Sequence, residues 1–180
     1  MQVRQTTMDR LVVLRSDRVM TEILDNLRSP ILLATAVACG LQAGTYYTWA
    51  TGVMPGLARV DDRTFVHAMQ QMNIAIVNPV FLATFLGAPA LALVAIASSD
   101  GAGRRWVIAG AAFAVATVAI TAIGNIPLNN TLDAAGPIDK IGDLGAVRDA
   151  FESSWVRLNV VRALTSTASL GCLVWAALLG

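Results

Sequence analysis

The C-terminal stretch SSWVRLNVVRALTSTASLGCLVWAALLG, residues 153–180, decides the fold class of this chain. It is apolar for long enough to cross a bilayer as a helix, which takes about 20 mostly apolar residues. Trp155, Asn159 and Arg162 nevertheless lie within it at a spacing that places all three on one helical face. An arginine facing lipid at the bilayer centre costs on the order of 2.5–3.5 kcal/mol by insertion scales. The stretch therefore predicts a membrane helix whose polar face turns toward other protein segments.

The composition of the whole chain is also typical of a membrane protein. Of its 180 residues, 56% are hydrophobic and 14% are charged, whereas soluble domains carry about 25% charged residues. The mean hydropathy is +0.62. Runs long enough to span a bilayer predict membrane helices at residues 31–52, 74–98, 106–125 and 157–178. The predicted fold is all-α, an integral membrane four-helix antiparallel bundle with an amphipathic outer-loop helix before the fourth span.

The distribution of positive charge predicts how the bundle is oriented, because arginine and lysine favour the cytoplasmic side. Residues 1–29 are predicted to form a cytoplasmic N-terminal extension, and residues 30–180 the four-span membrane domain. The extension and the loop between the second and third spans carry Arg4, Arg10, Arg15, Arg18, Arg28, Arg104 and Arg105. Both termini are therefore predicted to be cytoplasmic, in the plasma membrane of a bacterial cell. The lipid bilayer is the expected partner, and a net charge of +1 gives no support for nucleic acid.

The first predicted span has a small residue at every fourth position. These residues are Ala36, Gly40, Gly44, Thr48, Gly52 and Gly56. Small side chains let helices approach closely where lipid supplies no hydrophobic drive. The pattern predicts a packing seam between this helix and another helix of the same chain.

Polar side chains recur at the outer end of each predicted span. His67, Gln71 and Asn78 share one face of the segment that leads into the second span, and Pro127 predicts that the third helix kinks or ends there. The candidate site residues are Tyr46, Tyr47, His67, Gln71, Asn78, Asn125, Asn129, Trp155, Asn159 and Arg162. Their convergence on one level indicates a functional site. Alternatively, these groups only tie the helix ends together, with Arg162 reaching outward to water and the aromatic residues anchoring the membrane interface.

Four stretches resemble, in order and spacing, the motif series of the anthrone oxygenase-like family of small four-span membrane proteins. They are AGTYYTWATGVMPGLAR (43–59), FVHAMQQMNIAIVNPVF (65–81), NIPLNNTL (125–132) and WVRLNVVRALTS (155–166). The resemblance runs from about Leu33 to the end of the chain. Members linked to aromatic polyketide pathways are associated with oxidising anthrones to anthraquinones with O₂ and no evident cofactor. The resemblance thus implies a hydrophobic aromatic substrate, O₂ as co-substrate, and neither a cofactor nor a metal.

The resemblance also suggests roles for the polar residues. His67 is the only histidine, and histidine is the usual base at neutral pH, so it is predicted to remove the methylene proton. Arg162 and Asn159, the other predicted catalytic residues, would stabilise the developing enolate oxygen. The predicted substrate contacts are Tyr46, Tyr47, Gln71, Asn78, Asn125, Asn129 and Trp155.

Three other interpretations remain at this stage. The first is a non-catalytic membrane protein that binds a lipid or quinone-like ligand or a membrane partner, as a homo- or hetero-oligomer. The second is a Cu(I) site at His67, Met69 and Met72, which is disfavoured because the two methionines belong to the apolar helical face. The third is a transporter, which is disfavoured because the sequence has no obvious inverted repeat and the spans have no acidic residue.

Overall fold

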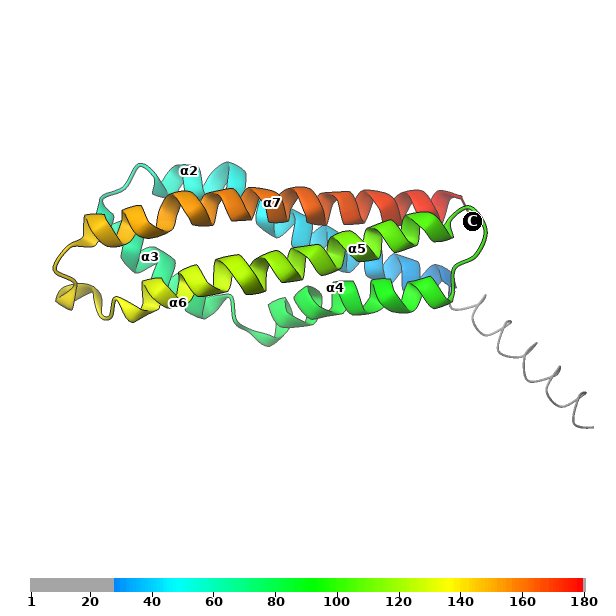
Figure 1. Ribbon diagram of the computed structural model, residues 1–180, viewed down its shortest axis with the longest axis horizontal. Coiled ribbons are helices and arrows are strands. Elements are labelled where there is room, and N and C mark those ends of the chain that lie inside the picture. Colours follow the sequence, from blue (N-terminus) through cyan, green and yellow to red (C-terminus); the bar gives the residue numbers. More distant parts are fainter. Residues whose placement is uncertain (1–27, 180) are drawn as a thin grey trace, which may run out of the picture.

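The computed structural model describes residues 28–179, which are almost wholly helical (Figure 1). Residues 28–48 form a helix that continues through the π turn η1 (Trp49–Val53) into α2 (Met54–Leu57). The elements that follow are α3 (Asp62–Ala75), α4 (Pro79–Ala97), α5 (Arg104–Ile120), the π turn η2 (Thr121–Asn125), α6 (Ile126–Ala134), η3 (Ile138–Lys140) and α7 (Leu144–Leu178). The predicted extension, residues 1–29, lies almost entirely outside the described residues.

Three helices are long and apolar enough to cross a membrane. They are Pro79–Ala97, Arg104–Ala134 and Leu144–Leu178, and they contain most of the second, third and fourth predicted spans. Large apolar side chains on their outer surfaces are exposed, among them Leu86, Val115 and Val174. Exposed apolar surface of this extent is compatible with an integral membrane protein. The predicted first span, residues 31–52, is helical as well.

The helices run antiparallel, so that residue 28 and the C-terminal end of α7 lie at the same end of the molecule (Figure 1). Arg28 Nη1 forms an ion pair of 2.9 Å with Asp100 Oδ1, which joins the first helix to the α4–α5 loop. A Cβ atom on Gly103 in that loop would lie 3.2 Å from Arg28 Nη2 and 3.3 Å from the Ala176 carbonyl oxygen. These contacts confirm the antiparallel four-helix bundle. We call this the inner end and the opposite one the outer end; which of them is cytoplasmic stays a prediction.

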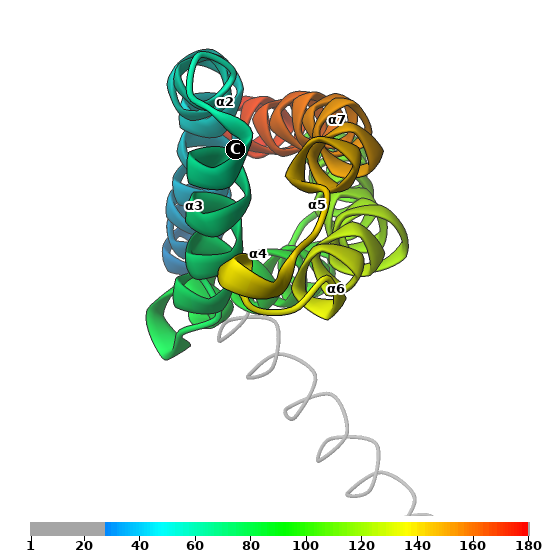
Figure 2. The same ribbon diagram turned by 90° about the vertical axis from the view of Figure 1, so that its left-hand side faces the viewer.

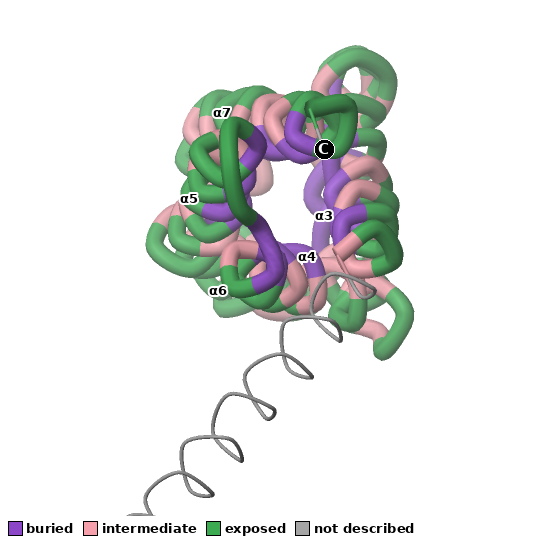
Figure 3. The backbone as a smooth tube through the Cα atoms, turned by 90° about the vertical axis from the view of Figure 1, so that its right-hand side faces the viewer, coloured by how far each residue is buried: buried purple, intermediate pink, exposed green. Residues whose placement is uncertain are grey.

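The inner half of the bundle is packed with small side chains from all four helices. Its core consists of Leu32, Ala38, Cys39, Ala88, Ala95, Val107, Leu173 and Ala176, and the buried positions face the centre of the bundle (Figure 3). Ser169 Oγ donates to the Gly110 carbonyl oxygen at 2.8 Å, and a Cβ on Gly110 would lie only 2.8 Å from Leu173 Cγ. Small residues at this contact let α5 and α7 approach closely.

The outer half has a core of larger side chains. Met54, Phe65, Val66, Met69, Leu132, Phe151 and Trp155 form it, contributed by α2, α3, α6 and the N-terminal part of α7, which Figure 2 views end-on. At 1.5 Å per residue α7 is about 52 Å long, whereas the hydrocarbon core of a bilayer is about 30 Å thick. The predicted outer-loop helix is therefore present, but it is continuous with the fourth span.

Two predicted helix boundaries are wrong. The second predicted span is interrupted: α3 ends at Ala75, and Asn78 is extended and caps α4, its Oδ1 accepting from Phe81 N at 3.0 Å. An extended residue before Pro79 is expected, because proline disfavours helical geometry in the residue that precedes it. The third helix continues past Pro127 to Ala134, so of the two predicted outcomes, a kink or an end, the end does not occur. The wider turn of η2 comes just before this proline, and such π turns accommodate a missing backbone N–H.

The predicted packing seam on the first helix is also wrong. A Cβ added to Gly44, Gly52 or Gly56 would have nothing within 4 Å, and only Gly40 approaches another helix, at 3.9 Å from Leu170. The buried positions of this helix are instead Leu32, Thr35, Ala38, Cys39, Gln42, Ala43 and Tyr46. The helix is rotated so that most of the small-residue ladder faces outward.

Candidate functional site

Arg162 is buried near the middle of α7, with 7% of its surface exposed. Its Nη2 donates to Asn159 Oδ1 at 3.0 Å. The guanidinium carbon lies 4.5 Å from the ring centre of Tyr46 and 5.3 Å from that of Trp155. Aromatic faces attract a desolvated cation, by about 2 kcal/mol in favourable cases. The arginine therefore faces the bundle interior and does not reach outward to water.

No carboxylate pairs with Arg162 among the described residues. The ion pairs found there are Arg28–Asp100, Arg63–Asp139, Arg148–Asp62 and Arg148–Glu152. Within the same part of the chain, Nε of Arg162 is buried and has no hydrogen-bond acceptor. A buried cation without an anion is costly, and a buried donor without an acceptor adds to the cost. The guanidinium thus carries a charge and an N–H that no described residue satisfies.

Two residues on the same face of α7 tie this site to the surrounding helices. Asn159 Nδ2 donates to the Tyr46 carbonyl oxygen at 3.1 Å, which joins α7 to the first helix. Trp155 Nε1 donates to Asn129 Oδ1 at 2.9 Å, which joins α7 to α6. The ring of Trp155 also packs against Trp49, with 5.1 Å between ring centres. The face that carries Trp155, Asn159 and Arg162 therefore cross-links three elements.

A cavity of about 130 Å³ adjoins Arg162. Its lining residues are Thr45, Tyr46, Trp49, Met72, Asn73, Ile76, Val77, Phe81, Leu82, Phe85, Thr121, Ile126, Asn129, Trp155 and Arg162. The walls are mostly aromatic and aliphatic, and Arg162 is the one charged side chain among these lining residues. Asn73 Nδ2 is a second buried donor for which the described residues provide no acceptor. An apolar cavity with a few convergent polar groups is typical of a small-molecule site.

The two π turns lie beside this cavity. Trp49 begins η1 and Thr121 begins η2, and both residues line the cavity. Asn125 ends η2 with 1% of its surface exposed, and neither of its side-chain amide atoms has a partner in the described part of the chain. π turns inside helices are frequent at functional sites. Their position here supports a ligand site enclosed by the first helix, α3, α4, α6 and α7.

The sequence profile described as Anthrone oxygenase matches residues 68–172, more than half of the chain. The chain belongs to the anthrone oxygenase family. The match includes the predicted site residues Gln71, Asn78, Asn125, Asn129, Trp155, Asn159 and Arg162, and it begins directly after His67. No curated protein and no solved structure matches the chain.

In this anthrone oxygenase family member, His67 and Gln71 do not meet the Arg162 cavity. Both are exposed, because α3 turns Phe65, Val66, Met69 and Gln70 toward the protein. Asn78 belongs to the break between α3 and α4. The structure therefore does not bring these three residues, which the sequence placed on one face of the segment leading into the second span, to the cavity beside Arg162.

Of the two predicted tyrosines, one is buried and the other is exposed. Tyr46 is buried, and its hydroxyl donates to Gln42 Oε1 at 2.8 Å, whereas Tyr47 is 63% exposed and faces away from the protein. Met69 is fully buried in the outer core, so it does not converge with exposed His67 on a copper site. No group of three or more His, Cys, Asp or Glu side chains suited to a metal occurs in residues 28–179.

Several cavity residues were not among the predicted site residues. Trp49, Met72, Phe81, Phe85 and Thr121 resemble ordinary apolar or small membrane-helix residues in the sequence, so only their position identifies them. Asn73 stands three residues after Gln70, and Gln70 is buried, with Nε2 donating to the carbonyl oxygens of Leu132 and Gly136 at 3.0 and 3.1 Å. Gln70 and Asn73 share a helical face, but so do His67 and Gln71, so the spacing alone did not show which face of α3 turns inward.

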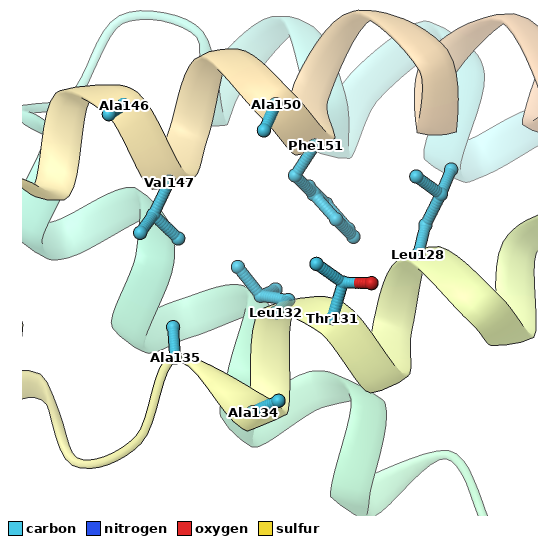
Figure 4. Close-up of a pocket in the computed structure, with 9 residues that line it drawn as sticks. All are labelled: Leu128, Thr131, Leu132, Ala134, Ala135, Ala146, Val147, Ala150 and Phe151. Carbon is cyan, nitrogen blue, oxygen red and sulfur yellow. The ribbon is translucent and has the colours of Figure 1, made fainter.

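A larger hollow of about 410 Å³ lies between α6 and α7 nearer the outer end (Figure 4). Its lining residues are Leu128, Thr131, Leu132, Ala134, Ala135, Ala146, Val147, Ala150 and Phe151. Thr131 supplies the one polar side chain of this set, and none of these residues carries a charge. Because it has no group able to activate a ligand, we assign the candidate site to the smaller cavity beside Arg162.

Proposed function

We propose that this family member is a membrane-embedded oxygenase. It would oxidise a polycyclic aromatic ketone of the anthrone type to a quinone with O₂ and without a cofactor. The observation that carries the proposal is the buried guanidinium of Arg162, which lies in an aromatic cavity without a carboxylate partner. Membership of the anthrone oxygenase family supports the same reaction. The proposal includes four membrane spans with both termini on the cytoplasmic side.

The reaction begins with an anion that Arg162 can stabilise. An anthrone loses a proton from its methylene group and becomes an enolate, whose negative charge lies largely on oxygen. In the proposal this oxygen accepts the free Nε–H of Arg162, where low polarity strengthens the attraction. Asn159 Oδ1 accepts from Nη2 of the same guanidinium, so Asn159 is a positioning residue that orients Arg162.

The oxidation of the enolate is balanced by O₂ alone. One electron passes from the enolate to O₂, and a C–O bond then forms between the former methylene carbon and the reduced oxygen. Protonation gives a hydroperoxide. Loss of water breaks the O–O bond and the remaining C–H bond at that carbon, which leaves the second carbonyl group. The sum is anthrone and O₂ to anthraquinone and water, so no further reductant is needed.

The base differs from the one expected from the sequence. His67 is exposed on the outer face of α3 and is not among the residues that line the cavity. The proposal therefore has the substrate bind uncharged and lose its methylene proton to water once it lies beside Arg162. Arg162 would favour the anion by its charge, so a protein base in the cavity is not required.

The test is O₂ uptake by the detergent-purified protein supplied with anthrone. Protein-free buffer is one control, because anthrones oxidise unaided. Arg157→Met is the matched variant, since Arg157 is an exposed arginine on the same helix whose Nη2 donates to Ser154 Oγ. Saturable uptake is expected for the unchanged, Arg157→Met and His67→Ala proteins, and the buffer rate for Arg162→Met. Uptake by the unchanged protein no faster than buffer would refute the proposal.

A second candidate is a non-catalytic protein that binds a quinone-like or lipid ligand in the same cavity, alone or with a membrane partner. The observation in its favour is that the lining residues include no histidine or carboxylate to act as a base. It predicts saturable binding of an aromatic ketone that depends on Arg162, without O₂ uptake above the buffer rate.

A further inference from the structure

The outer half of α4 is less embedded in the protein than its inner half. Ala88, Ala92 and Ala95 are buried, whereas no residue between positions 79 and 87 is. Val80 is 78% exposed, and Val77, just before the helix, is 67% exposed. The inner half of α4 therefore anchors the helix in the bundle, and the outer half lies against the protein by one side only.

Two interruptions of the backbone hydrogen-bond ladder bound this outer half. At one end Asn78 is extended and begins a new helix. At the other end Pro89 lies inside the helix and has no N–H to donate to the carbonyl of Phe85. Helices bend most readily at such positions. Residues 79–87 can therefore move as a unit relative to the rest of α4.

A hydrogen-bonded chain connects this segment to the Arg162 site. The hydroxyl of Tyr46 donates to Gln42 Oε1, and Gln42 Nε2 donates to Thr84 Oγ1, both at 2.8 Å. Tyr46 in turn lies under the guanidinium of Arg162. The Gln42–Thr84 bond thus joins the first helix to the outer half of α4 at the edge of the cavity.

The same part of α4 forms one wall of the cavity. Val77, Phe81, Leu82 and Phe85 all line it, and Val77 and Leu82 are also exposed on the apolar outer surface. The rings of Phe81 and Phe85 are nearly parallel, with 5.6 Å between centres and 11° between planes. This wall therefore presents flat aromatic surface to the cavity and apolar surface to the acyl chains.

The size of the cavity limits what it encloses. A cavity of about 150 Å³ is known to hold benzene, so about 130 Å³ has room for roughly one aromatic ring. A molecule with three fused rings fits only if part of it extends between α4 and its neighbours.

We propose that residues 79–87 form a lateral portal through which the ligand comes directly from the bilayer. The ligand is a flat, uncharged polycyclic aromatic with an acceptor oxygen. It places its oxygen-bearing edge beside Arg162 and leaves its remaining rings against Phe81 and Phe85, facing lipid. The Gln42–Thr84 hydrogen bond is the latch of this portal. The ligand class rests on the proposed function, but the portal does not depend on turnover.

The test uses the full-length protein in phosphatidylcholine vesicles and quenching of tryptophan fluorescence by quinones. Trp106 and Trp175, which lie at the inner end, are replaced by phenylalanine so that the signal comes from Trp49 and Trp155 in the site. Anthraquinone, which dissolves in the bilayer, is expected to quench saturably. Anthraquinone-2-sulfonate, which its charge holds in water, is expected not to. Saturable quenching by both probes, or by neither, would overturn the portal.

The latch is tested by the rates of quenching and recovery. Thr84→Val removes the bond to Gln42 and is expected to speed ligand exchange about two- to tenfold, the equivalent of one hydrogen bond. Thr117→Val is the matched control, because it removes a similar bond of 2.7 Å, to Thr165 between α5 and α7, outside the cavity lining. Equal rates in the two variants would overturn the latch.

The portal and the oxygenase can fail separately. Saturable quenching by anthraquinone without O₂ uptake would refute the oxygenase and leave the portal intact. O₂ uptake with equal binding of both probes would refute the portal and leave the oxygenase intact.

Discussion

Arg148 and Arg162 stand about four turns apart on α7, and the surroundings of the two differ. Each guanidinium carbon lies 4.5 Å from an aromatic ring centre, that of Phe65 for Arg148 and that of Tyr46 for Arg162. Arg148 also has carboxylates: Nε donates to Glu152 at 2.6 Å and Nη1 to Asp62 at 3.0 Å. Arg162 has one amide oxygen, from Asn159, and a buried Nε without an acceptor in the described residues.

The difference shows how the same side chain serves two purposes. Arg148 donates also to the carbonyl oxygens of Val60 and Leu57, so it fastens the segment between α2 and α3 onto α7. Its charge is neutralised by the protein, which leaves nothing for a ligand. The charge of Arg162 is not neutralised by a described residue, and it lies beside a cavity. We therefore expect the first arginine to affect stability and the second to affect activity.

The largest expected effect is on activity, in Arg162→Met. The rate of O₂ uptake with anthrone should fall about 10²–10³-fold, as when one donor of an oxyanion-binding site is removed. The melting temperature should stay the same or rise, because a buried cation without an anion is removed. Arg162→Lys should recover part of the rate, since it keeps the charge but loses the planar guanidinium. A full rate in Arg162→Met would remove the distinction between the two arginines.

Arg148→Met should give the opposite result, a loss of stability with an unchanged rate per folded molecule. The free energy of unfolding should fall by about 2 kcal/mol, since Asp62 and Glu152 lose their partner but are partly exposed to water. Arg63→Met is the control, because the pair with Asp139 is exposed on both sides, and it should cost less than about 0.5 kcal/mol. Thermal unfolding in detergent measures both. Equal losses would mean that burial of the Arg148 pairs contributes nothing.

The smallest expected effect concerns Asp61, which caps α3 next to the Arg148 pairs. Its carboxylate accepts from the hydroxyl and backbone N–H of Thr64 at 2.7 and 2.9 Å, and these bonds hold its pKa below the ordinary value of 3.8. Because the pKa of Asp61 is lower in the folded protein than in the unfolded chain, its charged carboxylate stabilises the fold at pH values above 3.8. This stabilisation is lost as the pH falls through the folded-state pKa. Asp61→Ala should therefore lower the melting temperature slightly at pH 7 and less at pH 3. An equal difference at the two pH values would contradict the pKa assignment.

The helix boundaries separate what could be predicted from what could not. The apolar runs place the long apolar helices well, because hydropathy over about 20 residues outweighs local detail. The errors at Asn78 and Pro127 come from local backbone bonding, an N-cap in one case and a π turn in the other. Hydropathy contains no information about either. The error at His67 has another origin, since both faces of α3 carry polar residues and only the carbonyls of Leu132 and Gly136 select Gln70 as the buried one.

Composition and helical periodicity predicted an all-helical bundle compatible with a membrane, and they favoured an Arg162 that faces the protein interior over one that reaches outward to water. Both follow from the free energy of transferring single side chains between water and lipid. The sequence of each segment determines this free energy by itself. The identity of the groups around Arg162 was decided by the tertiary structure. Asn159 meets the Tyr46 carbonyl across 113 positions of the chain, and His67 is turned away although it is much nearer in sequence to Tyr46. Such contacts depend on how each helix is rotated about its axis, and that rotation is set by packing against the other helices.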